Sequence, residues 1–570
     1  MILNLMASPA KRKRVSGALT FEETQETMRP MQGPLDDLPT STDVLIVGAG
    51  PIGLTAANVL GRLGVNVVLL EKNDQTSELP KAIAVDDEYM RLLDVIGLAA
   101  PLEAHRTAPF GIHFMSPLGF ALVKVPGFTT PNGFGIRSAV LQPVLEKILL
   151  DGARRYESVK IRYASEINEL SQHGETIAVK LVTDDGTSRM ISAKYLLGCD
   201  GARSFVRQHL GIKFDGSRIS EPHLVIDAAE FPDQSPYSRF FCNPRRPLNS
   251  IPAPYGGRRL EFMLMPGDTR EEITSSASIR KLLDESSPYR GVDIKVIRST
   301  VYGFSERIAS ELRVGRVFLL GDAAHVMPPF GGQGMNTGAR DVANLSWKMV
   351  LGLRNLASDT FFDSYDHERR HHIRQIIDYS VRVGKVANIR SWPLALTRDL
   401  AFALINSVPA FRRYFGEMRY MPKPCMKSGF LVTDEVHKGG IVGKVFPRML
   451  WQRTWGEETN IDQLAPYRFA LIGVDLPIDT LRIMKNDPFW LQLDPIVILL
   501  KPHPNSTPQV ASLSTTSEDD VVTVFSDDPS LFDKYVGRVI TVRPDRYVAA
   551  VCRPSEFSEV TQTLAMKMRA

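Results

Sequence analysis

Asp43-Val44-Leu45-Ile46-Val47-Gly48-Ala49-Gly50-Pro51-Ile52-Gly53 is the stretch of sequence that decides the fold of this chain. Its apolar first half predicts a buried parallel strand, and residues 54–62 predict a helix after the glycines. A second apolar run, residues 65–70, ends at Glu71, 23 positions after Gly48. At that distance a carboxylate reaches the ribose of a bound dinucleotide, while the glycines permit a tight turn, a close pyrophosphate approach and a helix–strand contact. The alternative is an ordinary glycine turn, but strand, helix and acid together favour a dinucleotide site.

A second glycine-rich stretch lies about 270 residues later and reads Gly321-Asp322-Ala323-Ala324-His325-Val326-Met327-Pro328-Pro329-Phe330-Gly331-Gly332-Gln333-Gly334-Met335-Asn336. It places an acid, a rigid Pro-Pro pair and a glycine loop ahead of a helix predicted over residues 337–356. Glycine lets the backbone approach a flat ligand closely, and amides at a helix start face negative charge. We therefore expect the two distant segments to share one large cofactor.

A third segment, residues 195–207, also follows a strand–turn–helix pattern. Its turn is Asp200-Gly201, a pair typical of turns. Arg203 and Arg207 lie four positions apart and are expected on one face of the helix. Two interpretations stay open at this point, namely part of the same ligand site or an ordinary turn with two solvated arginines.

In this order, the three segments resemble the class A FAD-dependent aromatic hydroxylases. Residues 84–88, 256–264 and 317–322 are similar to the branch that contains 3-(3-hydroxyphenyl)propionate hydroxylases and polyketide hydroxylases. The resemblance covers residues 41–400 well and the C-terminal part more loosely. It implies an α/β fold in which a Rossmann-like FAD-binding domain carries an inserted β-sheet substrate domain, as in p-hydroxybenzoate hydroxylase, and a thioredoxin-like domain follows.

The resemblance also implies domain boundaries. We expect residues 41–215 and 300–400 to form the FAD-binding domain, residues 216–299 the substrate sheet and residues 424–570 the thioredoxin-like domain. Residues 1–40 are expected to be a disordered leader, whose basic cluster, residues 11–14, is either a solvated tail or a nuclear address. Arg546 stands where the family often has glycine, which leaves the type of the last turn open.

The activity that the resemblance implies is that of a monooxygenase. In the family, NADH or NADPH reduces FAD, and O2 then gives a C4a-hydroperoxyflavin that hydroxylates a phenolic or polyketide-derived aromatic ring. A Baeyer–Villiger or dearomatising reaction on a similar substrate remains an alternative. A flavin-binding quinone reductase without oxygenation and a non-enzymatic scaffold are further alternatives.

The family's motifs carry over to this chain residue by residue. The FAD-binding residues expected from the resemblance are Gly48, Gly50, Gly53, Glu71, Arg137, Asp200, Asp322, Gly334, Met335 and Asn336. Arg137 is placed at the start of a helix expected over residues 137–155. Lys81 stands where the family commonly has arginine, and because lysine lacks the planar fork of arginine, its contact near the flavin stays open.

No residue is an unambiguous catalytic group. Weak candidates are His325 as a base, Tyr255 as a partner of the substrate hydroxyl and Pro329 as part of a rigid, water-excluding wall. Tyr237 and Tyr302 are equivalent alternatives to Tyr255. The pair Arg258-Arg259 would bind a substrate carboxylate or, more commonly, lie solvated in a hairpin.

Composition excludes several other classes. A net charge of +4 is too small to indicate nucleic-acid binding, and no apolar run reaches the length of a membrane span. The four cysteines lack CxxC spacing, which suits a reducing cytoplasmic compartment and argues against a zinc or dithiol site. His371 and His372 are adjacent and would point apart on a helix, so no metal is expected. The expected partners are O2 and a small aromatic substrate, and a homodimer is conceivable through the C-terminal unit.

Overall fold

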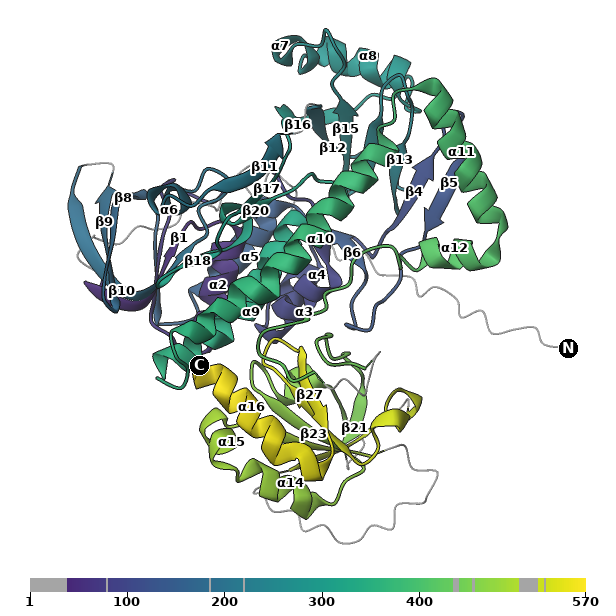
Figure 1. Cartoon of the computed structure of the whole chain (residues 1–570). Helices are drawn as coiled ribbons and strands as arrows, with labels where there is room; N and C mark the ends of the chain where they lie inside the picture. Colours follow the sequence, from purple (N-terminus) through teal and green to yellow (C-terminus); the bar gives the residue numbers. More distant parts are fainter. Residues whose placement is uncertain are drawn as a thin grey trace, which may run out of the picture.

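The chain forms two large sheets that share a cavity, and a third sheet lies below them (Figure 1). The structure, a computed structural model, describes residues 38–77, 80–183, 186–218, 221–433, 440–453, 457–501, 521–526 and 529–569. Almost all of the predicted leader falls outside the described residues.

The first sheet is the predicted Rossmann-like sheet. Its main path has the order β18-β19-β10-β1-β2-β7, and β9 and β8 extend it from β10. The strands are β1 (Ser41–Val47), β2 (Val67–Leu70), β7 (Val159–Arg162), β8 (Ser165–His173), β9 (Thr176–Thr183), β10 (Ser188–Gly198), β18 (Arg313–Val314) and β19 (Val317–Leu319). β19, β10, β1, β2 and β7 run parallel, so their carboxyl ends lie along one edge. Val44, Leu45 and Ile46 are fully buried, as expected for a parallel strand covered on both faces.

Helices cover this sheet and connect it to the rest of the chain. They are α2 (Pro51–Arg62), α3 (Asp87–Val95), α4 (Ala99–Glu103), α5 (Gln142–Ala153), α6 (Phe205–His209), α9 (Gly334–Leu353) and α10 (Asp363–Ala387). The helix predicted over residues 137–155 begins later than expected, at Gln142. Pro143 suits a first helical turn, whereas Arg137 lies before it in the short strand β6 (Arg137–Ala139), which pairs with β3 (Ala84–Asp86).

The second sheet is antiparallel apart from one pair and has the order β16-β12-β15-β14-β13-β4-β5. Its strands are β4 (Gly111–Met115), β5 (Ala121–Val125), β12 (His223–Ala229), β13 (Tyr237–Phe241), β14 (Leu248–Pro252), β15 (Arg258–Met263) and β16 (Lys295–Tyr302). β4 and β5 come from residues 111–125, well before the range predicted for this sheet. β4 joins it through parallel pairing with β13, a long-range contact that a local pattern does not reveal.

The two faces of this sheet differ in character. Because side chains alternate along a strand, Leu260 and Phe262 pack with Leu224 and Ile226 on one face, against α7 (Arg270–Ile273) and α8 (Ser276–Ser286). Arg259 and Glu261 take the other face. A three-stranded sheet of β11 (Phe214–Arg218), β17 (Ser305–Ala309) and β20 (His325–Val326) links the two large sheets.

The third sheet has the connectivity of a thioredoxin-like domain. β23 (Ala470–Val474) and β24 (Ile496–Lys501) are parallel, whereas β26 (Arg538–Val542) and β27 (Val548–Cys552) are antiparallel, and the four lie in the order β27-β26-β23-β24. The other elements are β21 (Trp451–Arg453), β22 (Glu458–Thr459), β25 (Val522–Ser526), α13 (Ile461–Leu464), α14 (Ile478–Lys485), α15 (Pro488–Leu493) and α16 (Phe557–Arg569).

The turn between β26 and β27 keeps a glycine-type backbone without glycine. Arg546 has a φ of +70°, a region that costs a non-glycine residue roughly 1–2 kcal/mol. Its buried guanidinium donates to Asp462 and to the carbonyl of Ala465. These charge-assisted bonds hold the turn in place.

A buried ionic cluster joins the C-terminal domain to α9 and α10. The carboxylate of Glu368 accepts hydrogen bonds from Arg543, from Lys348 and from the amide of Phe430, each at 2.8 Å. Burial alone would raise the pKa of Glu368, but the charges of Arg543 and Lys348 outweigh burial and lower it. The interface therefore depends on this carboxylate being ionised.

Replacing the carboxylate tests that dependence. We expect Glu368→Gln to lower the free energy of unfolding by about 3–5 kcal/mol, because two buried cations lose a counter-charge. Chemical denaturation followed by tryptophan fluorescence measures the change. The control is Glu175→Gln, whose exposed carboxylate pairs with Arg316 at 3.3 Å and should matter by less than about 0.5 kcal/mol. Equal effects of the two substitutions would contradict the assignment.

Candidate active site

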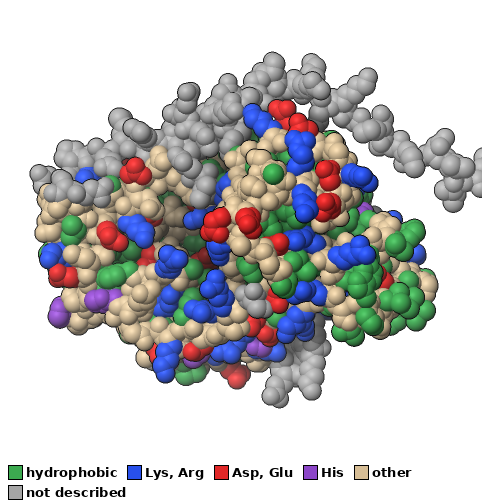
Figure 2. Space-filling model, turned by 90° about the horizontal axis from the view of Figure 1, so that it is seen from above, with side chains coloured by type: hydrophobic (Ala, Val, Ile, Leu, Met, Phe, Trp, Pro, Cys, Tyr) green, Lys and Arg blue, Asp and Glu red, His purple; other side chains and the backbone are tan. Residues whose placement is uncertain are grey.

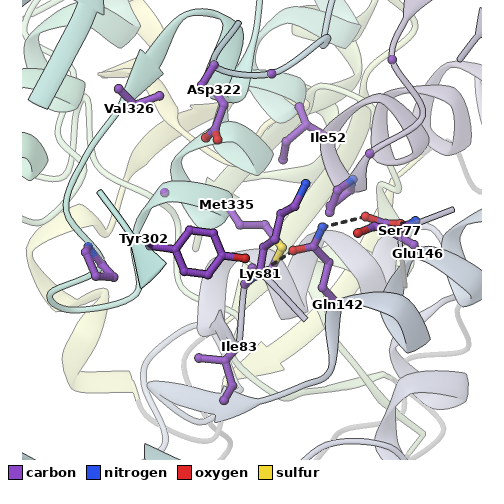
Figure 3. A pocket seen from close by; sticks show the side chains of 18 of the residues that line it. Ile52, Ser77, Lys81, Ile83, Gln142, Glu146, Tyr302, Asp322, Val326 and Met335 are labelled. Carbon is purple, nitrogen blue, oxygen red and sulfur yellow. Dashed lines mark hydrogen bonds between the residues drawn. The ribbon is translucent and has the colours of Figure 1, made fainter. Parts of the chain in front are cut away.

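A cavity of about 1340 Å³ lies between the carboxyl edge of the first sheet and the polar face of the second. Single-ligand pockets usually measure about 300–1000 Å³, so this space has room for a large cofactor and a second molecule. Side chains from widely separated parts of the sequence, among them Lys81, Tyr302, Asp322 and Met335, point toward the same space (Figure 3).

The first glycine motif lies where β1 turns into α2. Gly48 has a φ of +101°, and a Cβ there would lie 2.5 Å from the carbonyl oxygen of Cys199. A Cβ on Gly53 would lie 1.9 Å from the carbonyl oxygen of Gly48. Gly50 is different, because a Cβ there meets no atom within 4 Å and Gly50 lines the cavity. Gly48 and Gly53 thus allow the turn to form, whereas Gly50 leaves room for a ligand.

Two carboxylates stand at the ends of β2 and β10, the two strands that flank β1. Glu71, after β2, accepts a hydrogen bond from the amide of Ala49 at 2.8 Å and lines the cavity. Asp200, after β10, accepts from the amide of Val206 through one oxygen, while its buried Oδ1 has no hydrogen-bond partner among the described residues. Burial raises the pKa of Asp200. A ligand hydroxyl at this point would satisfy that oxygen.

The stretch that begins with Gly321-Asp322 contributes a third carboxylate. Asp322 points into the cavity (Figure 3), and enclosure by protein raises its pKa although nearby His325 and Lys81 lower it. Gly334 and Met335 begin α9 and also line the cavity, so the amide end of this helix faces the ligand space.

Asn336 is not among the residues that line the cavity, contrary to its predicted role. Its Oδ1 accepts from the amide of Asp86, and its Nδ2 donates to the carbonyl of Gly332 at 2.7 Å. The side chain therefore ties β3 to the loop before α9, which is a positioning role.

The segment around the start of α5 forms another part of the wall. Arg137 lines the cavity from β6 rather than from a helix start. Gln142 begins α5 and donates to Glu146, and its carbonyl oxygen accepts from the amide of Ala82 (Figure 3). Burial raises the pKa of Glu146 to about 7. Sequence analysis missed Gln142 and Glu146, although their position in the first two turns of a predicted helix next to the cofactor segments was a usable signal.

The opposite wall is the polar face of the second sheet. Arg259 is committed to protein partners there, since its Nε donates to Asp227 at 2.7 Å and its Nη1 donates to the carbonyl of Lys81 at 2.8 Å. Asn249 donates to Glu261 at 3.2 Å. Apolar side chains complete the wall around them, namely Phe110, Ile112, Val225, Phe240, Ile251 and Phe304.

The weak catalytic candidates divide into two groups. Pro329 and Tyr302 line the cavity. His325 does not line it, because the imidazole is fully buried with its Nε2 2.7 Å from a carboxylate oxygen of Asp341. Tyr255 also lies outside the lining, with its hydroxyl 2.7 Å from Nδ1 of His105.

Of the remaining side chains named from sequence, Arg203 lines the cavity, whereas Tyr237, Arg258 and Arg207 do not. The ring of Tyr237 stacks on His113 with centroids 4.0 Å apart. Arg258 donates to the hydroxyl of Ser250 and to backbone carbonyls, and it is buried rather than solvated. Arg207 is likewise buried and donates to the carbonyl of Ala323 at 2.8 Å, which braces the turn at Asp200-Gly201 against the turn at Gly321-Asp322. Among the described residues, no group of three His, Cys, Asp or Glu side chains forms a metal site.

Comparison with known proteins agrees with this geometry. Residues 41–380 match the family described as FAD binding domain, and residues 443–567 match the family described as HcaD C-terminal domain. A 3-(3-hydroxy-phenyl)propionate/3-hydroxycinnamic acid hydroxylase of Klebsiella pneumoniae is 33% identical over 93% of this chain and 95% of its own length. An Escherichia coli enzyme of the same name is 34% identical, again over 93% of this chain and 95% of its own length. The chain belongs to the FAD-dependent aromatic hydroxylases.

This hydroxylase also shares its fold with solved structures at lower identity. The flavin-dependent monooxygenase PieE, solved with FAD and substrate, has a TM-score of 0.74 at 22% identity, over 93% of this chain and 99% of PieE. Aklavinone-11 hydroxylase has a TM-score of 0.72 at 22% identity, over 92% of this chain and 98% of its own. The predicted fold class, the FAD cofactor and the monooxygenase activity are confirmed, and no comparison favours the alternative activities.

The residues at the site fit FAD. Three features suit a pyrophosphate and ribose hydroxyls. They are the free space at Gly50, the Asp200 oxygen that has no hydrogen-bond partner among the described residues, and the carboxylate of Asp322. Bound FAD, reduced by NADH or NADPH, activates O2 and supplies the oxygen atom.

Two glycine substitutions separate ligand binding from folding. We expect Gly50→Ala to leave the thermal midpoint of the flavin-free protein almost unchanged, because the added methyl group meets open space, but to weaken FAD binding at least about tenfold by blocking the pyrophosphate. Gly53→Ala should lower both the thermal midpoint and the affinity for FAD, since its methyl group collides with the carbonyl of Gly48. Flavin titration and differential scanning fluorimetry measure the two effects. Tight FAD binding by Gly50→Ala would show that the pyrophosphate lies elsewhere.

Proposed function

We propose that this enzyme binds FAD along the carboxyl edge of the first sheet and hydroxylates a phenolic ring held against the second sheet. The single observation that supports this is the continuous cavity between the three nucleotide turns and a mostly apolar wall with a few polar groups. The substrate class we favour is a hydroxylated phenylpropanoid or a polyketide-like phenol, as the names of the relatives and structural neighbours suggest.

Each part of the cavity then has a task. Gly50, Asp200 and Asp322 hold the nucleotide part of the cofactor. The amides of Gly334 and Met335 stabilise negative charge on its ring system, since a helix start attracts anions. Pro328 and Pro329 carry no N–H group and form a rigid rim that excludes water.

Isotope labelling tests this proposal directly. The purified protein should be yellow, and a phenol that it accepts should accelerate the oxidation of NADH or NADPH with matching O2 uptake. With ¹⁸O2, the product should gain one labelled oxygen, and NMR should place it on a ring carbon. A ring-expanded ester or lactone would instead assign Baeyer–Villiger chemistry, and NAD(P)H oxidation without a labelled product would assign the reductase alternative.

We also propose that the enzyme is a cytoplasmic homodimer that associates through α11 (Trp392–Ser407) and α12 (Pro409–Gly416), and not through the C-terminal unit that the sequence suggested. Hydrophobic side chains gather at the right of Figure 2, on the side of the molecule where Figure 1 places α11 and α12. Those exposed on the two helices and at the residue between them are Trp392, Leu394, Leu396, Leu400, Leu404, Val408, Phe411 and Tyr414. A contiguous exposed apolar face of this kind marks an interaction surface. Among the described helices no single one could cross a membrane by length and hydropathy, and only the pair α11–α12, bent by 106°, passes that test jointly.

A single charge should separate the two protomers. We expect Leu404→Glu, on a side chain that is 73% exposed, to convert the dimer into a monomer in light scattering without loss of bound flavin. The matched control is Ile483→Glu on α14, where an equally exposed side chain lies away from this face. A wild-type monomer, or an unchanged dimer in Leu404→Glu, would contradict the proposal.

A further inference from the structure

One carboxylate on the substrate-side wall has no part in the FAD site. Glu261 lies on β15, where the register pairs it with Asn249 on β14 and with Val225 on β12. All three residues line the cavity. Among the described lining residues, the other carboxylates lie on the FAD-binding domain and not on this sheet.

Glu261 is incompletely paired. Its Oε2 accepts one hydrogen bond, from Nδ2 of Asn249 at 3.2 Å, and among the described residues it forms no ion pair. The nearest guanidinium on the same strand, Arg259, points its donors at Asp227 and at the carbonyls of Pro80 and Lys81. A carboxylate with free acceptor capacity therefore faces a cavity built for a ligand.

The surrounding charges and the burial of Glu261 together suit a proton acceptor, which must be ionised and yet have a raised pKa. Asp227 on β12 carries two cations, Arg259 at 2.7 Å and Arg298 of β16 at 3.3 Å, so this part of the wall is balanced only when Glu261 is ionised. Burial raises the pKa of Glu261, the Arg259 charge and the Asn249 hydrogen bond lower it, and the Asp227 charge raises it. The net effect is a raised pKa, and the pKa of Glu261 is therefore closer to the pKa of a phenol.

The other candidate bases are placed less well. His325 is tied to Asp341 outside the lining, and Tyr255 is tied to His105. Asp322 stands at the carboxyl end of the first sheet, among the nucleotide turns. Tyr302 lies on the substrate wall, but a neutral phenol accepts a proton poorly.

We infer that Glu261 accepts the hydrogen bond of the substrate's ring hydroxyl and takes its proton during hydroxylation, and that Asn249 positions the carboxylate. This inference rests on the proposed function. The step moves one proton from the phenol oxygen to a carboxylate oxygen of Glu261, and the electron pair of the O–H bond stays on the phenol oxygen. The ring carbons ortho and para to that oxygen become more nucleophilic, which is what attack on the oxygen supplied by the flavin requires.

A specificity follows for the substrate. At this point of the wall the site takes an uncharged hydroxyl group, because Asp227 and the ionised Glu261 together already balance Arg259 and Arg298, and Glu261 repels a carboxylate. Any acidic group of the substrate must point away from β15. A site with an unpaired acceptor also rejects the analogue that lacks the hydroxyl, since the acceptor would then be buried without a partner.

The test compares Glu261→Gln and Glu261→Asp with Glu285→Gln. Glu285 is exposed on α8, on the opposite side of the sheet, and serves as the matched control. The probes are two pairs that differ by one hydroxyl, 3-(3-hydroxyphenyl)propionate with 3-phenylpropionate and 1-naphthol with naphthalene. The shift of the flavin absorbance on titration reports binding, and ¹⁸O-labelled product per NADPH oxidised reports coupling.

In the wild type and in Glu285→Gln, we expect the hydroxylated member of an accepted pair to bind more tightly. In Glu261→Gln, that preference should fall about tenfold or more, and product formation about 10²-fold, while NADPH oxidation continues and releases H2O2. Glu261→Asp should restore part of the coupling. Product formation by the wild type should decline as the pH falls through the raised pKa of Glu261, because only the carboxylate accepts the proton, and this limb should be missing from the residual activity of Glu261→Gln.

The outcomes separate two failures. If the wild type makes no labelled product with any phenol, the proposed function fails. If the wild type makes product and Glu261→Gln keeps wild-type coupling and hydroxyl preference, the inference about Glu261 fails alone. Should Glu261→Gln not retain flavin, Glu261→Asp decides, because a shortened carboxylate with full coupling and an unchanged pH profile would also overturn the assignment.

Discussion

The structure depends on a close backbone contact between two turns at the carboxyl edge of the first sheet. β1 and β10 are parallel neighbours, so the turn at Gly48 and the turn at Cys199 leave the sheet side by side. A Cβ on Gly48 would lie 2.5 Å from the carbonyl oxygen of Cys199, a distance that real Cβ atoms do not reach. Because β2 and β19 continue the parallel arrangement on either side, Glu71 and Asp322 emerge along the same edge. The cofactor site is therefore a consequence of strand order.

A buried carboxylate holds the other half of the site. Asp341 on α9 accepts from the amide of Gly321 and from Arg369 on α10, and Nε2 of His325 lies 2.7 Å away. Burial would raise the pKa of Asp341, but the charges of His325 and Arg369 outweigh it and keep the pKa low. This single group fixes the GD turn to two long helices, which explains why His325 belongs to the scaffold and not to the cavity.

The second sheet brings charged side chains to this scaffold, because successive side chains along β15 point to opposite faces of the sheet. One face of β15 closes the apolar core under α8, and the other presents Arg259 and Glu261 to the ligand space. The same two-residue period thus places apolar side chains in the core and charged side chains at the cavity. Arg259, paired with Asp227, also reaches across to the carbonyl of Lys81 and so connects the sheet to the segment that follows β2. The two walls of the cavity are held at a fixed separation by this contact.

The sequence by itself determined the nucleotide turns and the family, because glycine spacing, an acid at a set distance and apolar runs are local properties. Tertiary structure alone decided that β4 and β5 join the second sheet, that Arg137 lies in a strand, and that Glu261 lines the cavity whereas Asn336, His325 and Tyr255 do not. The physical reason is that the direction of a polar side chain depends on partners distant in sequence, such as Asp86 for Asn336 and Asp341 for His325, and no local pattern encodes them.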